Sequence, residues 1–156
     1  MAIAITLQQY LSDNKIDYDT LPHPYTMSSL KTAQASQVPG DCIAKGVVIK
    51  EGRDFLLAVL PASNHIRFDW LQSLLGEKVD LATEEEVEAL FADCELGAIP
   101  PVGKAYGLSV VRDDSLSHTG DVYFEGGDHK TLVRVKEEDF SRMMGHPLKG
   151  VFSRHD

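Results

Sequence analysis

Residues 42–61 read CIAKGVVIKEGRDFLLAVLP and hold two apolar runs on either side of a short turn. Residues 42–50 and residues 54–61 are rich in valine, isoleucine and leucine, and the EGR between them contains a glycine. Apolar, β-branched runs that flank a glycine-containing turn are typical of two antiparallel strands that follow each other directly. The sequence therefore predicts a β-hairpin at this position.

The segments around the hairpin predict a mixture of helices and further strands. The clearest helix start is Thr83, because Glu86 lies three residues later and completes a capping box before an apolar stripe. Gly76 is expected to end another helix, and Ser28 or Ser29 to cap a third. Helices are expected after residue 6 and at residues 30–37, 69–75, 83–91 and 137–144, and strands at residues 16–21, 106–113, 121–127 and 131–136.

These elements do not alternate strictly between strand and helix, which favours an α+β, or mixed α/β, fold. We expect helices packed on one curved, largely antiparallel sheet of about six strands. The chain has 156 residues, without internal repeats, low-complexity tracts or long linkers. A chain of this length usually forms one core, so residues 1–156 are predicted to be a single domain.

The net charge of the chain limits its partners. The chain carries 24 acidic and 15 basic residues, a formal charge of -9. This balance argues against binding long stretches of nucleic acid through phosphates, although it allows recognition of a single nucleotide end. No run approaches the roughly 18 apolar residues of a membrane span, and the N-terminus lacks the basic region of a signal peptide. No membrane association and a cytoplasmic location are therefore expected.

Metal, cofactor and nucleophile motifs are not visible in the sequence. The two cysteines, Cys42 and Cys94, and the six histidines lack the spacing of a metal site. The sequence contains no nucleophile elbow, P-loop, zinc-protease or dinucleotide motif. We therefore predict no metal and no cofactor, and we interpret both cysteines as small buried side chains.

Lys45 is the first candidate for a functional residue. It interrupts the first apolar run of the hairpin and is followed directly by Gly46. Lysine is seldom buried without a partner, so a lysine within a strand can indicate a binding or catalytic role. A lysine that faces solvent on an edge strand is an equally plain interpretation. The spacing alone leaves both open.

Two loops provide the other candidates. Residues 95–103, ELGAIPPVG, combine glycines that allow close approach of a ligand with prolines that stiffen the backbone. They could form a pocket wall or only a rigid connector. In residues 123–135, YFEGGDHKTLVRV, His129 lies between two expected strands. It could transfer a proton or donate a hydrogen bond, although a surface histidine in a turn is the commoner case.

Taken in order, these segments resemble one known family. AKGVVI at residues 44–49, LPA at 60–62, TEEEVEALFADCELGAIPPVG at 83–103 and EGGDHKTLVRV at 125–135 resemble the YbaK-like family. Its members are free-standing relatives of the editing domain that is inserted in bacterial prolyl-tRNA synthetases. The resemblance extends from the first helix to the EDFSRM segment, and residues 97–101 match the family's G-x-x-x-P loop.

The resemblance implies a deacylase that hydrolyses the ester between a wrong amino acid and the terminal ribose of a tRNA. Lys45 matches the family's lysine and is the expected catalytic residue, holding the terminal phosphate or the ester as a compact positive charge. The loop is expected to border the aminoacyl pocket, and His129 to have a positional role. The expected substrate-binding residues are Gly97, Pro100, Pro101, Gly103 and His129.

The resemblance also implies a substrate class and partners. The expected substrate is tRNA for proline carrying alanine, serine, threonine or cysteine, and pocket residues could include Met27, Ser28 and Ser29. Because the chain is acidic, we expect weak, salt-sensitive tRNA binding, helped by a synthetase or an elongation factor. The basic side chains that could form a small rim at the acceptor end are Lys31, Lys45, Lys50, Arg53, Lys104 and Lys130.

Two other functions stay open at this point. One is a non-catalytic module that binds an aminoacyl-tRNA or nucleotide end, which would use the same loop as a pocket wall. The other is a general hydrolase of small esters, which the lack of a visible nucleophile disfavours.

Overall fold

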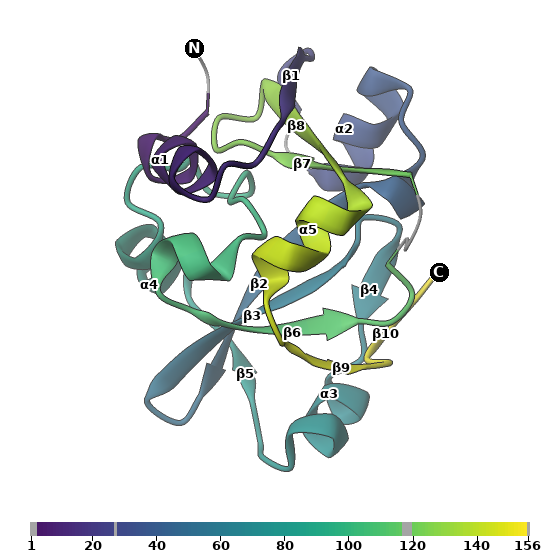
Figure 1. Ribbon diagram of the computed structural model, residues 1–156. Coiled ribbons are helices and arrows are strands. Elements are labelled where there is room, and N and C mark those ends of the chain that lie inside the picture. Colours follow the sequence, from purple (N-terminus) through teal and green to yellow (C-terminus); the bar gives the residue numbers. More distant parts are fainter. Residues whose placement is uncertain (1–2, 27, 117–119, 156) are drawn as a thin grey trace.

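The computed structural model describes residues 3–26, 28–116 and 120–155 (Figure 1). The described helices are α1 (Ile5–Asp13), α2 (Ser29–Ser36), α3 (Phe68–Leu75), α4 (Glu84–Leu90) and α5 (Glu137–Met144), with 3-10 turns η1 (Gly40–Cys42) and η2 (Gly103–Tyr106). The described strands are β1 (Asp19–Pro22), β2 (Ala44–Glu51), β3 (Asp54–Pro61), β4 (Asn64–Ile66), β5 (Asp80–Leu81), β6 (Ser109–Asp113), β7 (Asp121–Glu125), β8 (Thr131–Lys136), β9 (Leu148–Gly150) and β10 (Ser153–His155).

The predicted hairpin is confirmed and forms the middle of the largest sheet. β2 and β3 pair antiparallel over their whole length, from Ala44 opposite Pro61 to Glu51 opposite Asp54. Gly52 makes the turn between them with a φ of 61°, a conformation that glycine adopts without strain. The strand order of this five-stranded sheet is β5-β2-β3-β6-β9.

The α+β class is confirmed, but the strands form three sheets rather than one. β6 pairs parallel with both β3 and β9, so the five-stranded sheet is mixed. A three-stranded antiparallel sheet has the order β1-β8-β7, and β10 pairs with β4. The chain reaches β6 from β3 only after α3 and α4, and such a long crossover allows parallel pairing.

Strand β3 is buried on both faces, which explains why its sequence is continuously apolar. Leu57 and Val59 join the main core, to which α1 and α5 contribute apolar side chains. Leu56, Ala58 and Leu60 join a second core, where Leu71 of α3 is fully buried. Alternate residues of a strand point to opposite faces, so these two sets belong to opposite sides of the sheet.

The helix ends follow the local signals in the sequence. Thr83 and Glu86 form the predicted capping box, with hydrogen bonds of 3.1 Å and 2.9 Å between side chain and backbone. Ser28 caps α2 by accepting a hydrogen bond from the Lys31 N–H, and α3 ends at Gly76 in a left-handed conformation. α1 begins at Ile5, earlier than expected.

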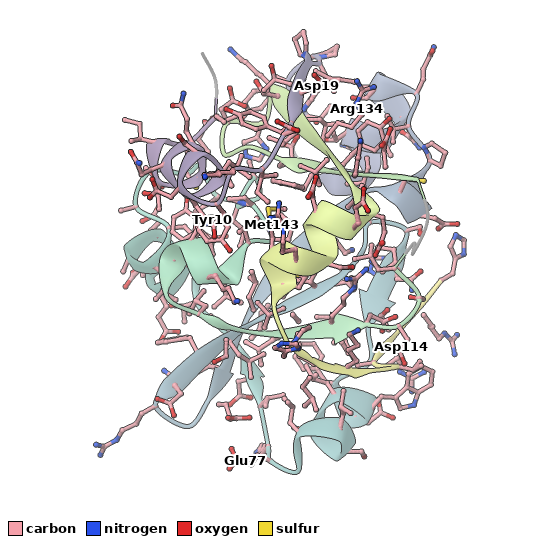
Figure 2. The ribbon with its side chains drawn as sticks, viewed as in Figure 1. Tyr10, Asp19, Glu77, Asp114, Arg134 and Met143 are labelled. Carbon is pink, nitrogen blue, oxygen red and sulfur yellow. The ribbon has the colours of Figure 1, made fainter. Side chains whose placement is uncertain are left out.

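Contacts between distant residues complete the fold. The Asp93 carboxylate accepts a hydrogen bond of 2.8 Å from the Thr6 N–H in the first turn of α1. Asp19 of β1 and Arg134 of β8 form an exposed ion pair of 2.5 Å, and both are labelled in Figure 2. None of the helices in the described part of the chain is both long and apolar enough to cross a membrane.

Candidate active site

A gap in strand pairing opens along one edge of β2. β3 occupies one edge, so every other partner of β2 lies on the opposite edge. There, Ile43 just before β2 forms an isolated bridge with Tyr123, and Ile49 and Lys50 pair with β5. On that edge, no described strand pairs with residues 44–47, and the Val48 carbonyl accepts a hydrogen bond of 3.1 Å from the Ala82 N–H just after β5. A cavity of about 320 Å³ lies at this unpaired edge.

The lining of the cavity shows that the β2 backbone forms one wall. All five consecutive residues from Ala44 to Val48 line it, whereas a strand presents only alternate residues on one face. The unpaired edge of the strand must therefore contribute. The other walls come from the loop before η2, from the β5–α4 segment and from the end of β7. Their residues are Leu81, Ala82, Glu84, Val87, Leu96, Gly97, Ile99 and Glu125.

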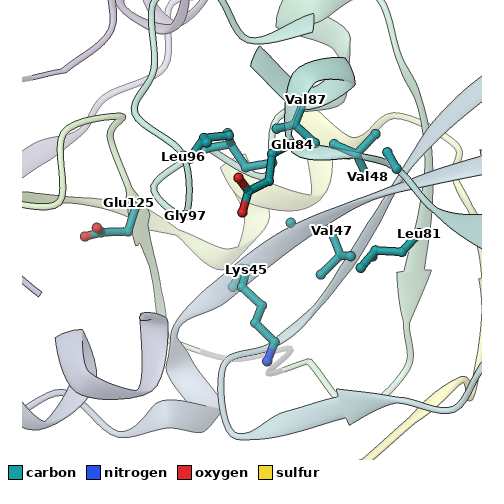
Figure 3. A pocket seen from close by; sticks show the side chains of 13 residues that line it. Lys45, Val47, Val48, Leu81, Glu84, Val87, Leu96, Gly97 and Glu125 are labelled. Carbon is teal, nitrogen blue, oxygen red and sulfur yellow. The ribbon is translucent and has the colours of Figure 1, made fainter. Parts of the chain in front are cut away.

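Lys45 lies in this cavity as a partly buried cation (Figure 3). Its Nζ donates a hydrogen bond of 3.4 Å to the Ala62 carbonyl. No carboxylate of the described residues forms an ion pair with it, and burial lowers its pKa below the ordinary 10.5. An ammonium group with one long hydrogen bond keeps donors available for an anionic ligand.

The loop that faces Lys45 is held from behind by His129. The His129 Nε2 lies 2.5 Å from the Leu96 carbonyl and donates its proton to it, since a carbonyl can only accept. The side chain is buried, and its ring packs against Tyr25 at a centroid distance of 5.2 Å. The Glu95 N–H also donates to the Gly127 carbonyl at 2.8 Å. His129 is thus placed to position residues 95–97.

Gly46 allows the same loop to pack closely on β2. A Cβ at Gly46 would lie 3.0 Å from Leu57 Cδ1 and 3.3 Å from Pro101 Cα. Contacts this short would require the neighbouring atoms to shift. The rigid loop therefore fits against β2 because residue 46 has no side chain.

The structure brings only part of the expected site to the cavity. Lys45 and Gly97 line it, with Gly97 in a conformation of φ 82°. Pro100, Pro101 and Gly103 are buried outside the lining, and a Cβ at Gly103 would lie 2.8 Å from the Leu108 carbonyl oxygen. These three residues belong to the loop itself, and His129 holds it through the Leu96 carbonyl. Direct contact of the four residues with a substrate stays a prediction. Of the further pocket candidates, Met27 lies outside the described residues.

A buried His23–Glu125 pair was not found by sequence reasoning. The His23 Nδ1 lies 2.7 Å from the Pro24 carbonyl and must donate to it, and its Nε2 lies 2.7 Å from Glu125 Oε1. That second contact needs one proton, which the imidazole and the carboxyl share. Burial raises the pKa of Glu125, which favours keeping this proton in the pair. Glu125 Oε2 is buried without a hydrogen-bond partner among the described residues.

Glu84 is the second lining carboxylate that the sequence did not single out. The acidic first turn of α4 indicated only a solvated helix start. In Figure 3 the Glu84 carboxylate points into the cavity, while the Lys45 ammonium extends in a different direction. Glu86, two residues later, is instead committed to the capping box and to Lys50, with Nζ and Oε2 2.8 Å apart.

No cysteine is among the described residues that line the cavity. Cys94 lies 3.3 Å from the Tyr106 hydroxyl, and burial raises the pKa of its thiol to about 12, so it stays protonated at neutral pH. Among the described residues, histidine, cysteine, aspartate and glutamate form no group of three that could hold a metal ion.

The expected basic rim is only partly available. Lys50 is paired with Glu86 on the hairpin side of α4. The Lys104 ammonium lies against the backbone at Gly145, where an added Cβ would collide with its Nζ, and the same lysine lines a separate groove beside α1. Of these side chains, Lys45 is the one that reaches the cavity.

Comparison with known proteins identifies the family. The model of the aminoacyl-tRNA editing domain family matches residues 23–143, which is most of the chain. The chain belongs to this family, so the resemblance to the YbaK-like editing domains is confirmed. No curated protein sequence matches the chain significantly.

Two solved structures show the same fold. The chain is similar to a hypothetical protein, APE2540, with a TM-score of 0.82 and 20% identity over 96% of this chain and 99% of the other. It is also similar to a protein provisionally described as a trans-editing enzyme for prolyl tRNA synthetase. There the TM-score is 0.83 and the identity 22%, over 96% of this chain and 95% of the other.

Proposed function

We propose that this protein is a trans-editing aminoacyl-tRNA deacylase. It hydrolyses the ester between a wrong amino acid and the terminal ribose of a tRNA, with mischarged tRNA for proline as the preferred substrate. The observation that carries the proposal is a partly buried lysine without a carboxylate partner in a cavity of about 320 Å³, within a chain of the editing family.

The reaction needs little from the protein beyond positioning. An aminoacyl ester is already labile, so holding it beside a water molecule and a fixed positive charge accelerates hydrolysis. The Lys45 ammonium holds the terminal phosphate or stabilises the oxyanion that forms on the ester carbonyl. The backbone of residues 96–97 orients the attacking water, and a neighbouring ribose hydroxyl can assist. This route agrees with the protonated state of the Cys94 thiol.

The cavity suits a small amino-acid side chain. Its volume is at the lower end for ligand pockets, and most of its lining residues are apolar, among them Ala44, Val47, Leu81 and Ile99. Alanine, serine, threonine and cysteine are therefore the amino acids we propose. Because one methylene changes binding by only about 1–3 kcal/mol, the discrimination among them is graded rather than absolute.

The proposed partner is the acceptor end of the tRNA alone. A formal charge of -9 leaves few cations for phosphates away from the cavity. We infer that binding is weak and weakens further with salt, so a synthetase or an elongation factor that delivers the charged tRNA would raise the rate.

A deacylation panel tests the proposal. tRNAs for proline, alanine, serine, threonine and cysteine, charged correctly or wrongly, are incubated with the wild type and with Lys45→Ala. We expect hydrolysis of one or a few mischarged species, lost in Lys45→Ala while its circular dichroism spectrum is unchanged. Equal hydrolysis by both proteins would reject the role of Lys45.

The alternative is a binding module without catalysis. Hydrolysis of no species, together with binding of an aminoacylated tRNA end that Lys45→Ala weakens, would establish this function instead. The same cavity would then be a recognition pocket.

A further inference from the structure

The charged side chains of the cavity are one cation and two carboxylates, Lys45, Glu84 and Glu125. Glu125 shares a proton with His23, so this pair as a whole is neutral. Its Oε2 is buried from solvent. Glu84 is therefore the lining carboxylate whose charge no cation among the described residues balances.

The position of Glu84 separates it from the other acidic residues of its helix turn. Its carboxylate is exposed, points into the cavity, and has no hydrogen bond or ion pair with another described residue (Figure 3). Glu85 is exposed and does not line the cavity, and Glu86 is held by Thr83 and Lys50. The three residues belong to the same first turn and experience similar helix-dipole effects.

We propose that Glu84 binds the α-ammonium group of the aminoacyl ester and thereby selects substrates with a free amine. This inference rests on the proposed deacylase function and specifies its substrate class. An aminoacylated nucleotide carries a phosphate at one end and an ammonium group at the other. Lys45 and Glu84 extend in different directions along the cavity, and their charges are complementary to such a ligand.

The ammonium group would contact Glu84 near the mouth of the cavity, where water still reaches both charges. An exposed ion pair contributes little, so we expect about a threefold to fivefold preference for the free amine over its N-acetyl form. An α-amino group loses its proton near pH 8, so the preference should disappear at about pH 9 and above. Added salt should reduce it as well.

Binding of stable analogues tests the inference without any reaction. Adenosine 5′-monophosphate carrying alanine through a 3′ amide, with its amine free or N-acetylated, is titrated by calorimetry into the wild type, Glu84→Gln and Glu85→Gln. The wild type and Glu85→Gln should prefer the free amine at about pH 6, and Glu84→Gln should bind both analogues equally. The N-acetyl analogue has no ammonium group, so any change in its affinity between the proteins comes from contacts other than the ion pair with Glu84, such as those of Lys45. An unchanged preference in Glu84→Gln, or no binding of either analogue, overturns the inference.

Hydrolysis separates this inference from the proposed function. Alanyl-tRNA and N-acetyl-alanyl-tRNA are given to the same three proteins, and Glu84→Gln should lose the preference seen in the other two. A preference in analogue binding without any hydrolysis would reject the deacylase but support the role of Glu84. Hydrolysis of both esters at the same rate by the wild type and Glu84→Gln would retain the deacylase and reject that role.

Discussion

The two ends of strand β2 each carry a lysine, and their surroundings differ. Lys50 is 42% exposed, its Nζ lies 2.8 Å from a carboxylate oxygen of Glu86, and the ring of Phe55 lies 5.9 Å from it. Lys45 has no such carboxylate, and burial lowers its pKa. At the Lys50 end β5 covers the strand edge, whereas at the Lys45 end the edge is open to the cavity.

The difference shows that the lysine without a carboxylate partner, Lys45, is the one that lines the cavity. Partial burial of an ammonium group without a carboxylate partner costs free energy, because water no longer solvates it fully. A ligand phosphate or a developing oxyanion at Lys45 would recover that cost. The lysine at the other end already has its partner, Glu86, and joins β2 to the first turn of α4.

The largest effect should follow from removing the charge at the cavity end. Lys45→Met keeps most of the side-chain volume, and we expect kcat/KM for the mischarged tRNA to fall at least about 100-fold, as for loss of one oxyanion donor. Lys45→Arg retains the charge and should lose less. Lys50→Met is the matched control and should stay within about twofold, since its charge is paired away from the cavity. Similar losses at both lysines would remove the distinction between the two ends.

A smaller effect is expected from the glycine next to Lys45. Gly46→Ala places a Cβ 3.3 Å from Pro101 Cα, so the loop must shift and kcat/KM should fall about tenfold. Urea unfolding should also show a loss of about 1–3 kcal/mol in stability.

The turn at the other end of the strand provides its control. Gly52→Ala meets no atom within 4 Å, but its φ of 61° is unfavourable for alanine. It should cost about 1 kcal/mol of stability and leave the activity unchanged. Full activity of Gly46→Ala would show that the loop does not need its close approach to β2.

The pH dependence of the reaction should report the lowered pKa of Lys45. In the proposed reaction the ammonium form of Lys45 is the active one, so the enzymatic rate, corrected for spontaneous ester hydrolysis, should decline as the pH rises through a value below 10.5. Lys45→Arg should move this decline to higher pH, because a guanidinium group stays charged. The measurement is kcat/KM between about pH 6 and pH 10 for both proteins. The same decline in Lys45→Arg would assign it to another group.

The smallest effect concerns the ion pair at the Lys50 end. The hydrogen bond from Lys50, followed by that from the Thr83 backbone, lowers the pKa of Glu86. The stabilisation is therefore present above the pKa of an ordinary glutamate and is lost as the pH falls through the lowered value. Lys50→Met should lower Tm by about 1–3 °C at neutral pH and not in acid. The exposed Lys78→Met is the control, and an equal Tm change there would assign the effect to charge in general.

Sequence patterns predicted the elements that are determined by residues close together in the chain. The hairpin, the capping box at Thr83, the stop at Gly76 and the helix at residues 137–144 all depend on neighbouring residues. The strands β4, β5, β9 and β10 have only two or three residues, too few for a periodic pattern. The parallel pairing of β3 with β6 depends on residues about fifty positions apart, which local patterns do not record.

The site shows the same division. Lys45 and Gly97, which line the cavity, stood out in the sequence because a lysine in an apolar run and a glycine in a rigid loop are locally unusual. Glu125 was missed because its partner His23 lies 102 residues away. Glu84 was missed because an acidic residue in a first helix turn has an ordinary structural explanation.

The unpaired edge of β2 also affects how the pocket can change in sequence among related proteins. Backbone amides and carbonyls are the same in every sequence, so a wall built from a strand edge survives exchange of the side chains that point into the two cores. The two related structures superpose closely on this chain while sharing only 20% and 22% of its residues. We therefore expect relatives with different substrates to differ at residues 96–99 and in the first turn of α4 rather than in the strand wall.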